Sequence, residues 1–561
     1  MKRSLLLVLL IASLLVNPAI FAGQRQAQPP RQATAPSQGA AVAPAPQPQA
    51  KFVNRQLPNG LEMIVLEDHS IPLVTCELAV RNGSFTEPPE LNGLSHLYEH
   101  MFFKANRASV TGESYLTTID QLGIVYNGQT QEELVNYHFT TTSPNLPVAM
   151  RFMRDAVRYP LFDERQFEQE REVVIGELDR HDSNPFGFLS LEMNNRLFYK
   201  YPSRKNPGGD KQTVRSATTA MMRLIQGRYY VPNNSAIVVT GDVSPQAVFL
   251  MVQELFGDWP RREKDPFVEF PLVQHPPLPK SEGAIIKQPV QNIIIEIGWQ
   301  GPSIGKDNPA TYAADVFSFI LRQPNSRFQR ALVDTGLVSG VSLGYYTQRN
   351  VGPINIIAQT TPENARAALR AIYNEVAHFN DRDYFTDEQL ETAKALLEAN
   401  DLFDREKLSD YTHIISFWWA STGIDYFRGY LGNLRRTKRA DISRYVTTYI
   451  HGKPHVGLAL LSEEAAKTSQ LNPDDLIGDE HVGDAAPDQR LGLAHLLAAH
   501  ADRSGGDLPA RDLGAFVALR VRAQAHAVSF YGVRHARDVA LERIEIENER
   551  RRIDFVERDS D

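Results

Sequence analysis

The chain has 561 residues, of which 42% are hydrophobic, and its formal net charge is −8 at pH 7. This length allows several domains of roughly 150 residues each, and the apolar content is sufficient for buried cores. Neither the net charge nor the sequence pI of about 6.0 indicates the clustered basic surface that nucleic-acid binding needs, so we expect no nucleic-acid partner. The only cysteine, Cys76, excludes an intramolecular disulfide and a cysteine-based metal cluster.

Residues 1–22 have the order of a secretory signal peptide, with Lys2 and Arg3 followed by an apolar run and then by small residues. The apolar run is short for a transmembrane helix, although an uncleaved anchor is the alternative. We therefore expect export to a periplasm or to the medium, with no integral membrane segment once the signal is removed. Residues 23–50, which are rich in Pro, Ala and Gln, predict a disordered spacer.

Strand and helix patterns alternate after this spacer. The apolar segments "LEMIVLED" and "LVTCELAV" are separated by a turn, "HSIP", and we expect them to pair as a hairpin. "NGLSHLYEHMFFKA" predicts a buried helix, and residues 124–126 and "NYHFTTT" predict further strands. "NLPVAMRFMRDAVRYP" and "DERQFEQEREVVIGELDRH" have helical periodicity, and "SAIVVTGDV" predicts a strand that leads into the amphipathic helix of "SPQAVFLMVQELFGDW".

The second half of the chain repeats the first. Prolines crowd residues 263–284, which predict an interdomain linker. Beyond it, "IIIEIGWQGPSIGKDNPATYAADVFSF" can be laid over "CELAVRNGSFTEPPELNGLSHLYEHMFF", and "TTPENARAALRAIYNEVAHF" over "VSPQAVFLMVQELFGDW". The overlays predict a duplicated α+β unit with domains at residues 51–262 and 285–477.

Residues 478–561 have a different composition, with twelve arginines, no lysine and five of the fifteen histidines. We interpret them as an appended tail; the alternatives are a disordered segment and an aberrant reading of the gene. None of the five histidines has ligand spacing, so we expect them to be solvated rather than metal-bound.

The segment "LSHLYEH" carries the chemistry. His96 and His100 are four residues apart and lie on one face of a helix, where both imidazoles can bind one metal ion. The alternative is a helix with two surface or core histidines. Glu99 lies about 60° around the helix from His96, which places its carboxylate to hold water at the metal rather than the metal itself. A catalytic zinc needs three protein ligands, so the third must come from elsewhere in the chain.

The order H-x-x-E-H, together with "EREVVIGE" at residues 170–177, resembles the pitrilysin/insulinase family of zinc metallopeptidases, the inverzincins, which include the mitochondrial processing peptidase. In that family a glutamate within E-x-x-V-V-x-x-E is the third ligand, about 76 residues beyond the motif. Here 76 residues separate His100 from Glu177. The resemblance covers residues 51–477. It implies an α+β fold of two homologous α/β-sandwich domains, which together form half of a clamshell.

The resemblance also implies a role for each motif residue. His96, His100 and Glu177 would bind one zinc ion per chain, and Glu99 would be the general base. Glu170, two helical turns before Glu177, would be the second catalytic glutamate, which supports the ligands from behind. The alternative for Glu170 is a solvated helix carboxylate. In the second copy, the residues opposite the H-x-x-E-H motif are Tyr312, Asp315 and Val316, so that copy lacks the histidines.

Substrate-binding residues are implied in both halves. "YNGQTQEELVNYHF" resembles the edge strand N-A-x-T of the family, in which Asn127 and Thr130 match and Gly128 replaces the alanine. A substrate that adds as a strand to this edge would be an extended or unfolded peptide. In the second half, "SRFQRALVDTGLVSGVS" keeps the substrate-holding Arg327 of single-chain members, but Ser339 stands where their tyrosine would be. Tyr345 and Tyr346 lie nearby in the sequence.

In lacking this tyrosine, the chain resembles the catalytic subunit of paired family members. In those pairs, a second, ligand-less homologous subunit supplies the Arg/Tyr pair. We therefore expect a homodimer or a heterodimer with such a subunit. The leading hypothesis is an exported zinc endopeptidase whose dimer encloses a peptide chamber. The alternatives are a non-catalytic member that binds peptide or scaffolds a complex, and a purely structural zinc. Retention of all four motif residues favours the enzyme.

Overall fold

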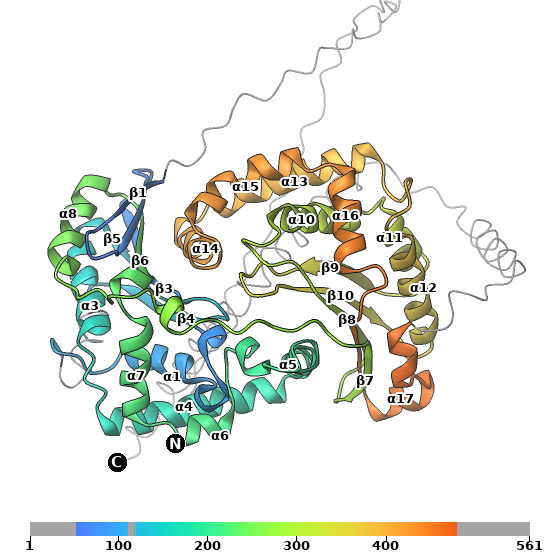
Figure 1. Ribbon diagram of the computed structural model, residues 1–561, viewed down its shortest axis with the longest axis horizontal. Helices are drawn as coiled ribbons and strands as arrows, with labels where there is room; N and C mark the ends of the chain where they lie inside the picture. Colours follow the sequence, from blue (N-terminus) through green and yellow to red (C-terminus); the bar gives the residue numbers. More distant parts are fainter. Residues whose placement is uncertain (1–51, 110–116, 118, 120, 479–561) are drawn as a thin grey trace, which may run out of the picture. The chain divides into compact units, whose positions relative to one another are not determined.

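The computed structural model of the protein describes residues 52–109, 117, 119 and 121–478. The predicted signal peptide, the predicted spacer and all but the first residue of the predicted tail lie outside the described residues. The described residues form two mixed sheets with helices packed on their faces, which confirms the predicted α+β class (Figure 1).

The first sheet has the strand order β1-β2-β6-β3-β5-β4. Its strands are β1 (Val53–Gln56), β2 (Glu62–Glu67), β3 (Leu73–Val80), β4 (Val125–Thr130), β5 (Val135–Thr142) and β6 (Ser235–Gly241). The predicted hairpin of β2 and β3 is wrong, because β6 lies between them and pairs with both. All seven residues of β6 are buried, so this apolar strand takes the centre of the sheet.

The second sheet has the order β7-β11-β8-β10-β9, which repeats the order β2-β6-β3-β5-β4. The parallel pair also recurs, as β2 with β6 and as β7 with β11. The strands are β7 (Glu282–Lys287), β8 (Ile293–Gln300), β9 (Gly340–Tyr345), β10 (Pro353–Thr360) and β11 (Val456–Leu461). The duplication is therefore visible in the hydrogen-bonded topology as well as in the sequence.

One of the two sequence overlays does not survive in this topology. Helix α12 (Ala365–His378) follows β10, as α3 (Leu146–Arg158) follows β5 in the first half. The overlay instead pairs α12 with α8 (Pro245–Phe256), which follows β6. The helix that follows the corresponding strand β11 is α17 (Glu463–Ser469). Two amphipathic helices of similar length gave a plausible but incorrect match.

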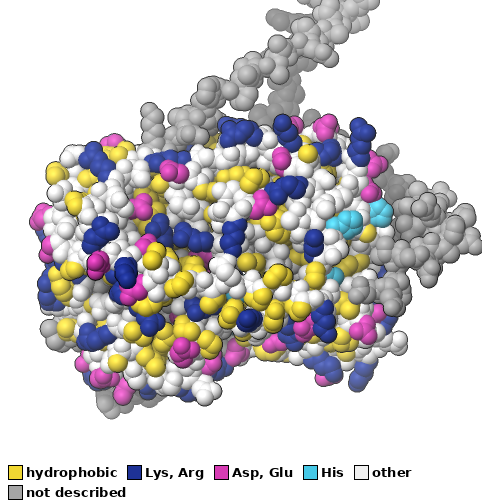
Figure 2. Space-filling model, viewed as in Figure 1, with side chains coloured by type: hydrophobic (Ala, Val, Ile, Leu, Met, Phe, Trp, Pro, Cys, Tyr) yellow, Lys and Arg dark blue, Asp and Glu magenta, His cyan; other side chains and the backbone are white. Residues whose placement is uncertain are grey.

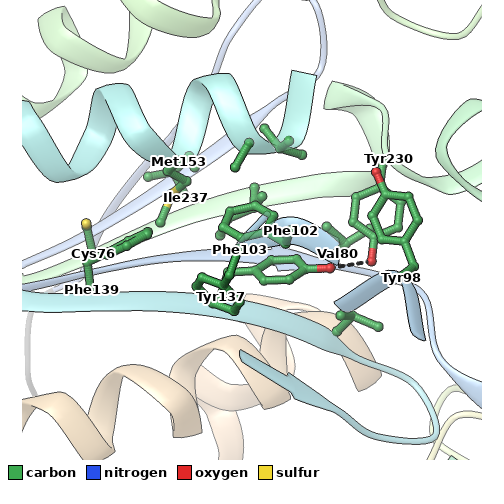
Figure 3. Close-up of a cluster of buried hydrophobic side chains, with 14 of the residues drawn as sticks. Cys76, Val80, Tyr98, Phe102, Phe103, Tyr137, Phe139, Met153, Tyr230 and Ile237 are labelled. Carbon is green, nitrogen blue, oxygen red and sulfur yellow. Dashed lines mark hydrogen bonds between the residues drawn. The ribbon is translucent and has the colours of Figure 1, made fainter. Parts of the chain in front are cut away.

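Buried hydrophobic side chains of the first half pack helix α1 (Leu94–Phe102) against one face of the first sheet. The ring of Phe102 stacks on that of Tyr137 with centroids 3.7 Å apart, and Tyr98 packs on Tyr230 at 4.0 Å. The hydroxyls of Tyr137 and Tyr230 are hydrogen-bonded at 2.7 Å (Figure 3). Aromatic packing on one side of α1 therefore determines where its polar residues point.

One face of each sheet is covered by a helix from the other half of the chain (Figure 1). In the first sheet this is the face opposite α1. Helix α14 (Leu408–Ser421) packs on β3 and β6 of the first sheet, where Thr412 and Thr240 are hydrogen-bonded through their hydroxyls at 2.6 Å. Helix α5 (Pro185–Leu197) packs on β8 and β11 of the second sheet through an apolar cluster that includes Leu189 and Met193. In the chain, α4 (Glu164–Ser183) precedes α5, and α13 (Asp387–Asp404) precedes α14.

A second set of contacts between the halves is polar. Glu133 accepts hydrogen bonds from the backbone N–H groups of Arg349 and Asn350 at 2.8 and 2.9 Å. The buried Lys205 ammonium donates to the carbonyl oxygens of Asn350 and Val351, each at 2.7 Å. These contacts hold the loop between β9 and β10 against the first half.

The remaining described helices are α6 (Lys211–Arg215), α7 (Thr219–Tyr229), α9 (Pro266–Glu269), α10 (Asn308–Arg322), α11 (Arg327–Gln329), α15 (Ile424–Arg436) and α16 (Arg439–Tyr449). No helix in the described part of the chain has both the length and the apolar character needed to cross a bilayer. On the face in Figure 2, acidic and basic side chains are interspersed around patches of hydrophobic side chains.

Candidate active site

The start of α1 is held by a buried carboxylate. Glu87 accepts hydrogen bonds from the backbone N–H groups of Gly93 and Ser95 at 2.7 and 2.5 Å, and thereby satisfies two donors at the helix N-terminus. Gly93 has a φ of 94°, a conformation that favours glycine. Burial raises the pKa of Glu87 to about 7, although these hydrogen bonds oppose that shift. The first turn of the helix is thus fixed immediately before His96.

The structure brings the three predicted zinc ligands together. The Nε2 atoms of His96 and His100 are 3.3 Å apart, and each lies 3.4 Å from Oε2 of Glu177. Glu177 belongs to α4, which packs against α1. Donor atoms that lie about 2.1 Å from one zinc ion at tetrahedral angles are separated by about 3.3–3.5 Å. The three donors therefore have the type and the spacing that a zinc ion requires.

Glu170 is not one of the three donors, but its carboxylate is hydrogen-bonded to one of them, His100. Nδ1 of His100 donates to Oε2 of Glu170 at 3.1 Å, and Nζ of Lys104 lies 2.6 Å from Oε1. A hydrogen bond at Nδ1 fixes the tautomer and leaves the Nε2 lone pair free to bind a metal. Glu170 therefore positions His100, which corresponds to the supporting role that the resemblance implied.

The electrostatics of the cluster favour a cation among the donors. Burial opposes a charge on His100, but hydrogen bonds with Glu170 and Glu177 outweigh it and raise the pKa of His100 to about 9. For Glu177, burial opposes ionisation, yet hydrogen bonds with His100 and His96 hold its pKa far below the usual range. The carboxylates therefore supply the negative charge that a divalent ion would neutralise.

Glu99 lies next to the edge strand β4. Its side chain is buried, with 4% exposure, and a Cβ built on Gly128 would come within 2.2 Å of its Oε1 atom. Among the described strands, β4 pairs only with β5 and forms the end of the sheet. Thr130 in β4 has a buried hydroxyl without a hydrogen-bond partner in the described residues, and Oδ1 of Asn127 accepts from the N–H of Gly128 at 3.0 Å. Glu99, the predicted general base, therefore lies beside a strand edge that has no further strand partner among the described residues.

Arg327 is not brought to the donor triangle. It lies in α11, where its Nε is 3.3 Å from Oε2 of Glu375 and its Nη1 is 3.8 Å from Oδ2 of Asp381. The guanidinium also lies over the ring of Tyr384, 5.1 Å from its centroid. These contacts are all within the second half, so the charge of Arg327 is already paired there.

The side chain of Tyr346, in the second half, also contacts the hairpin of β4 and β5. Its hydroxyl lies 3.4 Å from Oε1 of Gln131 and 3.4 Å from Oε2 of Glu132, in the turn between β4 and β5. Tyr345 instead donates to the carbonyl of Pro302 at 3.0 Å. The sequence did not distinguish these two tyrosines, because their orientation depends on how the loop after β9 is held.

Comparisons with known proteins agree with this architecture. Residues 62–202 match the family "Insulinase (Peptidase family M16)", and residues 218–397 match "Peptidase M16 inactive domain". The zinc protease PqqE of Helicobacter pylori is 22% identical over 398 residues, which cover 70% of this chain and 89% of that protein. The second match begins before β6, although the hydrogen bonds of β6 assign it to the first sheet.

Solved structures share the fold. A protease from Helicobacter pylori superposes with a TM-score of 0.67 at 22% identity, over 73% of this chain and 100% of that one. The periplasmic protease PqqL from Escherichia coli superposes with a TM-score of 0.64 at 16% identity, over 79% of this chain and 51% of that one. The two-sheet fold is thus one that this chain shares with proteins named as proteases. The chain belongs to the insulinase family, peptidase family M16.

Proposed function

We propose that the protein is a zinc-dependent endopeptidase that hydrolyses extended or unfolded peptides, with one zinc ion bound by His96, His100 and Glu177. The observation that carries the proposal is the mutual spacing of 3.3–3.4 Å among the three donor atoms. The adjacent carboxylate of Glu99 supplies the one further group that hydrolysis needs. The name of the Helicobacter pylori relative, a zinc protease, supports the same class of activity.

The proposed mechanism assigns a task to each side chain. A zinc ion in this site would polarise the scissile carbonyl and make water more acidic. Glu99 takes the proton from the attacking water and delivers it to the leaving amine. Glu170 keeps the imidazole of His100 oriented while this occurs.

Substrate binding is proposed at the edge of the first sheet. An extended peptide adds to β4 as a further strand, beside Asn127 and Thr130, with its backbone hydrogen-bonded to the unpaired edge. A folded protein does not offer such a free segment, so it is a poor substrate. Arg327 is the proposed contact from the second half, and to reach substrate its guanidinium must exchange its ion pair with Glu375.

We also propose a location and an assembly. The signal-peptide pattern at residues 1–22 and the periplasmic location of the Escherichia coli protease PqqL support export to a periplasm or to the medium. Ser339 at the tyrosine position supports a homodimer or a heterodimer with a ligand-less homologous subunit. Cell fractionation tests the first proposal, and light scattering of the purified chain, alone and with candidate subunits, tests the second.

The experiment that tests the function is hydrolysis of a quenched fluorescent peptide library by the purified chain. Activity and metal content are measured before chelation, after chelation and after zinc is restored. We expect cleavage to disappear with the metal and to return with it, and a reduced, unfolded protein to be cleaved faster than its folded form. Bound zinc without cleavage, alone or with a homologous subunit, would favour the non-catalytic alternative, and absence of zinc would refute the proposal.

A further inference from the structure

The face of the first sheet opposite α1 carries a second cluster of metal-binding side chains. Glu77 comes from β3, His138 from β5 and His413 from α14, and one donor atom of each lies within 4.8 Å of the other two. Among the described residues, only this cluster and the triangle of His96, His100 and Glu177 bring three such donors together. The cluster shares no residue with the H-x-x-E-H site, so the family's zinc site does not account for it.

Strand register and helix packing together build this cluster. Glu77 and His138 are directly opposite each other in the β3–β5 pair, so their side chains share one face of the sheet. His413 arrives from the helix that covers this face, and its Nδ1 is hydrogen-bonded to Oε2 of Glu77. The rings of His138 and His413 have centroids 4.3 Å apart. Three elements thus converge on one point between the two halves.

The carboxylate of this cluster is held in place, and one of the imidazole nitrogens has no partner. Glu77 is fully buried, and its other oxygen, Oε1, accepts a hydrogen bond from Asn136 at 2.6 Å, which holds the carboxylate in place. Nδ1 of His138 is buried and has no hydrogen-bond partner among the described residues. A buried polar atom without a partner is costly, and a ligand bound to Nδ1 of His138 would remove that cost.

The second sheet shows that the fold itself does not require such a cluster. Glu296 in β8 occupies the position that corresponds to Glu77 and is also buried. The residue opposite it in β10 is Ile357, where the first sheet has His138. A buried glutamate is therefore present in both sheets, but only in the first sheet does a histidine lie opposite it. The histidines of this cluster are thus not a requirement of the fold.

We infer that Glu77, His138 and His413 bind a divalent transition-metal cation, which joins the two halves of the chain. Two imidazoles and one carboxylate are a donor set that zinc accepts. When the ion binds, His413 and Glu77 each contact the metal instead of each other. The proton of their former hydrogen bond passes to solvent. The side chain of His413 is 24% exposed, which gives the ion and a fourth, water ligand a path to the site.

The position of this site links it to the edge strand. In the β4–β5 pair His138 lies directly opposite Asn127, one strand away from the edge where we propose that substrate binds. An ion bound to His138 and His413 would therefore tie β5 to α14 behind that edge. The inference does not depend on peptidase activity, because it concerns binding of metal by residues outside the zinc-ligand triangle.

The test is zinc binding by the full-length chain in a His96→Ala background, which removes a ligand of the first site. Metal is stripped, Zn²⁺ alone is added back, and tightly bound zinc and the thermal unfolding temperature are measured. We compare this parent with versions that also carry His138→Ala or His413→Gln. His451→Gln, which removes an exposed histidine outside the cluster, is the matched control.

We expect the parent and the His451→Gln control to retain one tightly bound zinc and to unfold at a higher temperature when zinc is present. The His138→Ala and His413→Gln versions should lose both that equivalent and the zinc-dependent rise. Cobalt in place of zinc should give the strong visible absorption of a four-coordinate ion only in the first pair. Equal zinc content in all four proteins, or no bound zinc in the parent, would overturn the inference and leave only a hydrogen bond between Glu77 and His413. Because His413 is partly exposed, its glutamine variant keeps the test decisive if His138→Ala fails to fold.

Discussion

The carboxylate of Glu99 occupies the space that a side chain at position 128 would need: a Cβ atom on Gly128 would lie 2.2 Å from Oε1, 2.8 Å from Cδ and 2.9 Å from Cγ of Glu99. Atoms this close cannot coexist, so the absent methyl group is a condition for the observed position of Glu99. The departure from the N-A-x-T pattern therefore has a structural consequence at the proposed general base.

The first prediction concerns Gly128→Ala. The new methyl group must displace the flexible end of Glu99, and a displacement of about 1 Å in a reacting group can lower the rate on the order of 100-fold. We expect kcat to fall to that extent while zinc content and thermal stability stay unchanged. The control is Gly344→Ala in β9, the corresponding edge strand, where an added Cβ meets no atom within 4 Å. Normal activity of Gly128→Ala would show that Glu99 acts from another position.

The second prediction separates the base from the ligands. Glu99→Gln keeps the shape of the side chain but removes the proton acceptor, so peptide hydrolysis should fall by about 10²–10⁴-fold with the zinc content unchanged. His96→Ala should lose both zinc and activity, because one of the three donors is gone. Metal analysis and peptide hydrolysis on the same samples make the comparison. Full activity in Glu99→Gln would rule out the proposed mechanism.

The third prediction concerns the support of His100. Glu170→Gln weakens the hydrogen bond to Nδ1 and removes the charge that faces Lys104, so we expect zinc affinity to fall by about 10–100-fold. Activity should recover when excess zinc is supplied, since the reacting groups themselves are intact. Glu168→Gln, an exposed glutamate on the same helix, should behave as the wild type. A loss of activity that zinc does not restore would assign Glu170 a direct part in the reaction.

The fourth prediction is a pH dependence of stability. Burial raises the pKa of Glu296 from 4.5 to about 8, so the folded state binds its proton more tightly than the unfolded state. The contribution of Glu296 to the stability of the wild type should therefore fall as the pH rises from about 5 to about 8, and level off above that. Glu296→Gln carries no ionisable group, so its advantage over the wild type should grow across this interval to a few kcal/mol.

Thermal unfolding between pH 5 and pH 9 measures this difference. Glu363→Gln, which alters an exposed glutamate of the second half, should leave the pH dependence of the wild type intact. A stability gap between Glu296→Gln and the wild type that does not change with pH would mean that Glu296 is ionised in the folded chain throughout.

Local periodicity was sufficient to predict the two helices that carry the proposed zinc ligands, but not the pairing of the strands. Spacings of four and seven residues place His96 with His100, and Glu170 with Glu177, on single helix faces, which depends only on helical geometry. The predicted hairpin failed because β6, which lies far along the chain, inserts between β2 and β3. A local pattern identifies a strand but does not show which distant strand will pair with it.

The same limit explains the residues that sequence reasoning missed. Glu77 and His413 are 336 residues apart, and no spacing rule connects them. Their contact requires both the register of β3 with β5 and the packing of α14 on the first sheet. Tyr346 reaches the turn after β4 only because Glu133 and Lys205 hold the loop that follows it. Tertiary packing, rather than a motif, determines each of these positions.

The exchange of α5 and α14 makes the two copies mutually dependent for folding. A fragment that ends at the linker would keep the zinc ligands but lose the helix that shields β3 and β6, and the apolar side of α5 would be left in water. The second copy lacks the H-x-x-E-H motif but still covers the sheet that carries the first copy's motif helix. Mutations that unfold the second copy should therefore abolish the proposed peptidase activity as completely as mutations of the proposed zinc ligands.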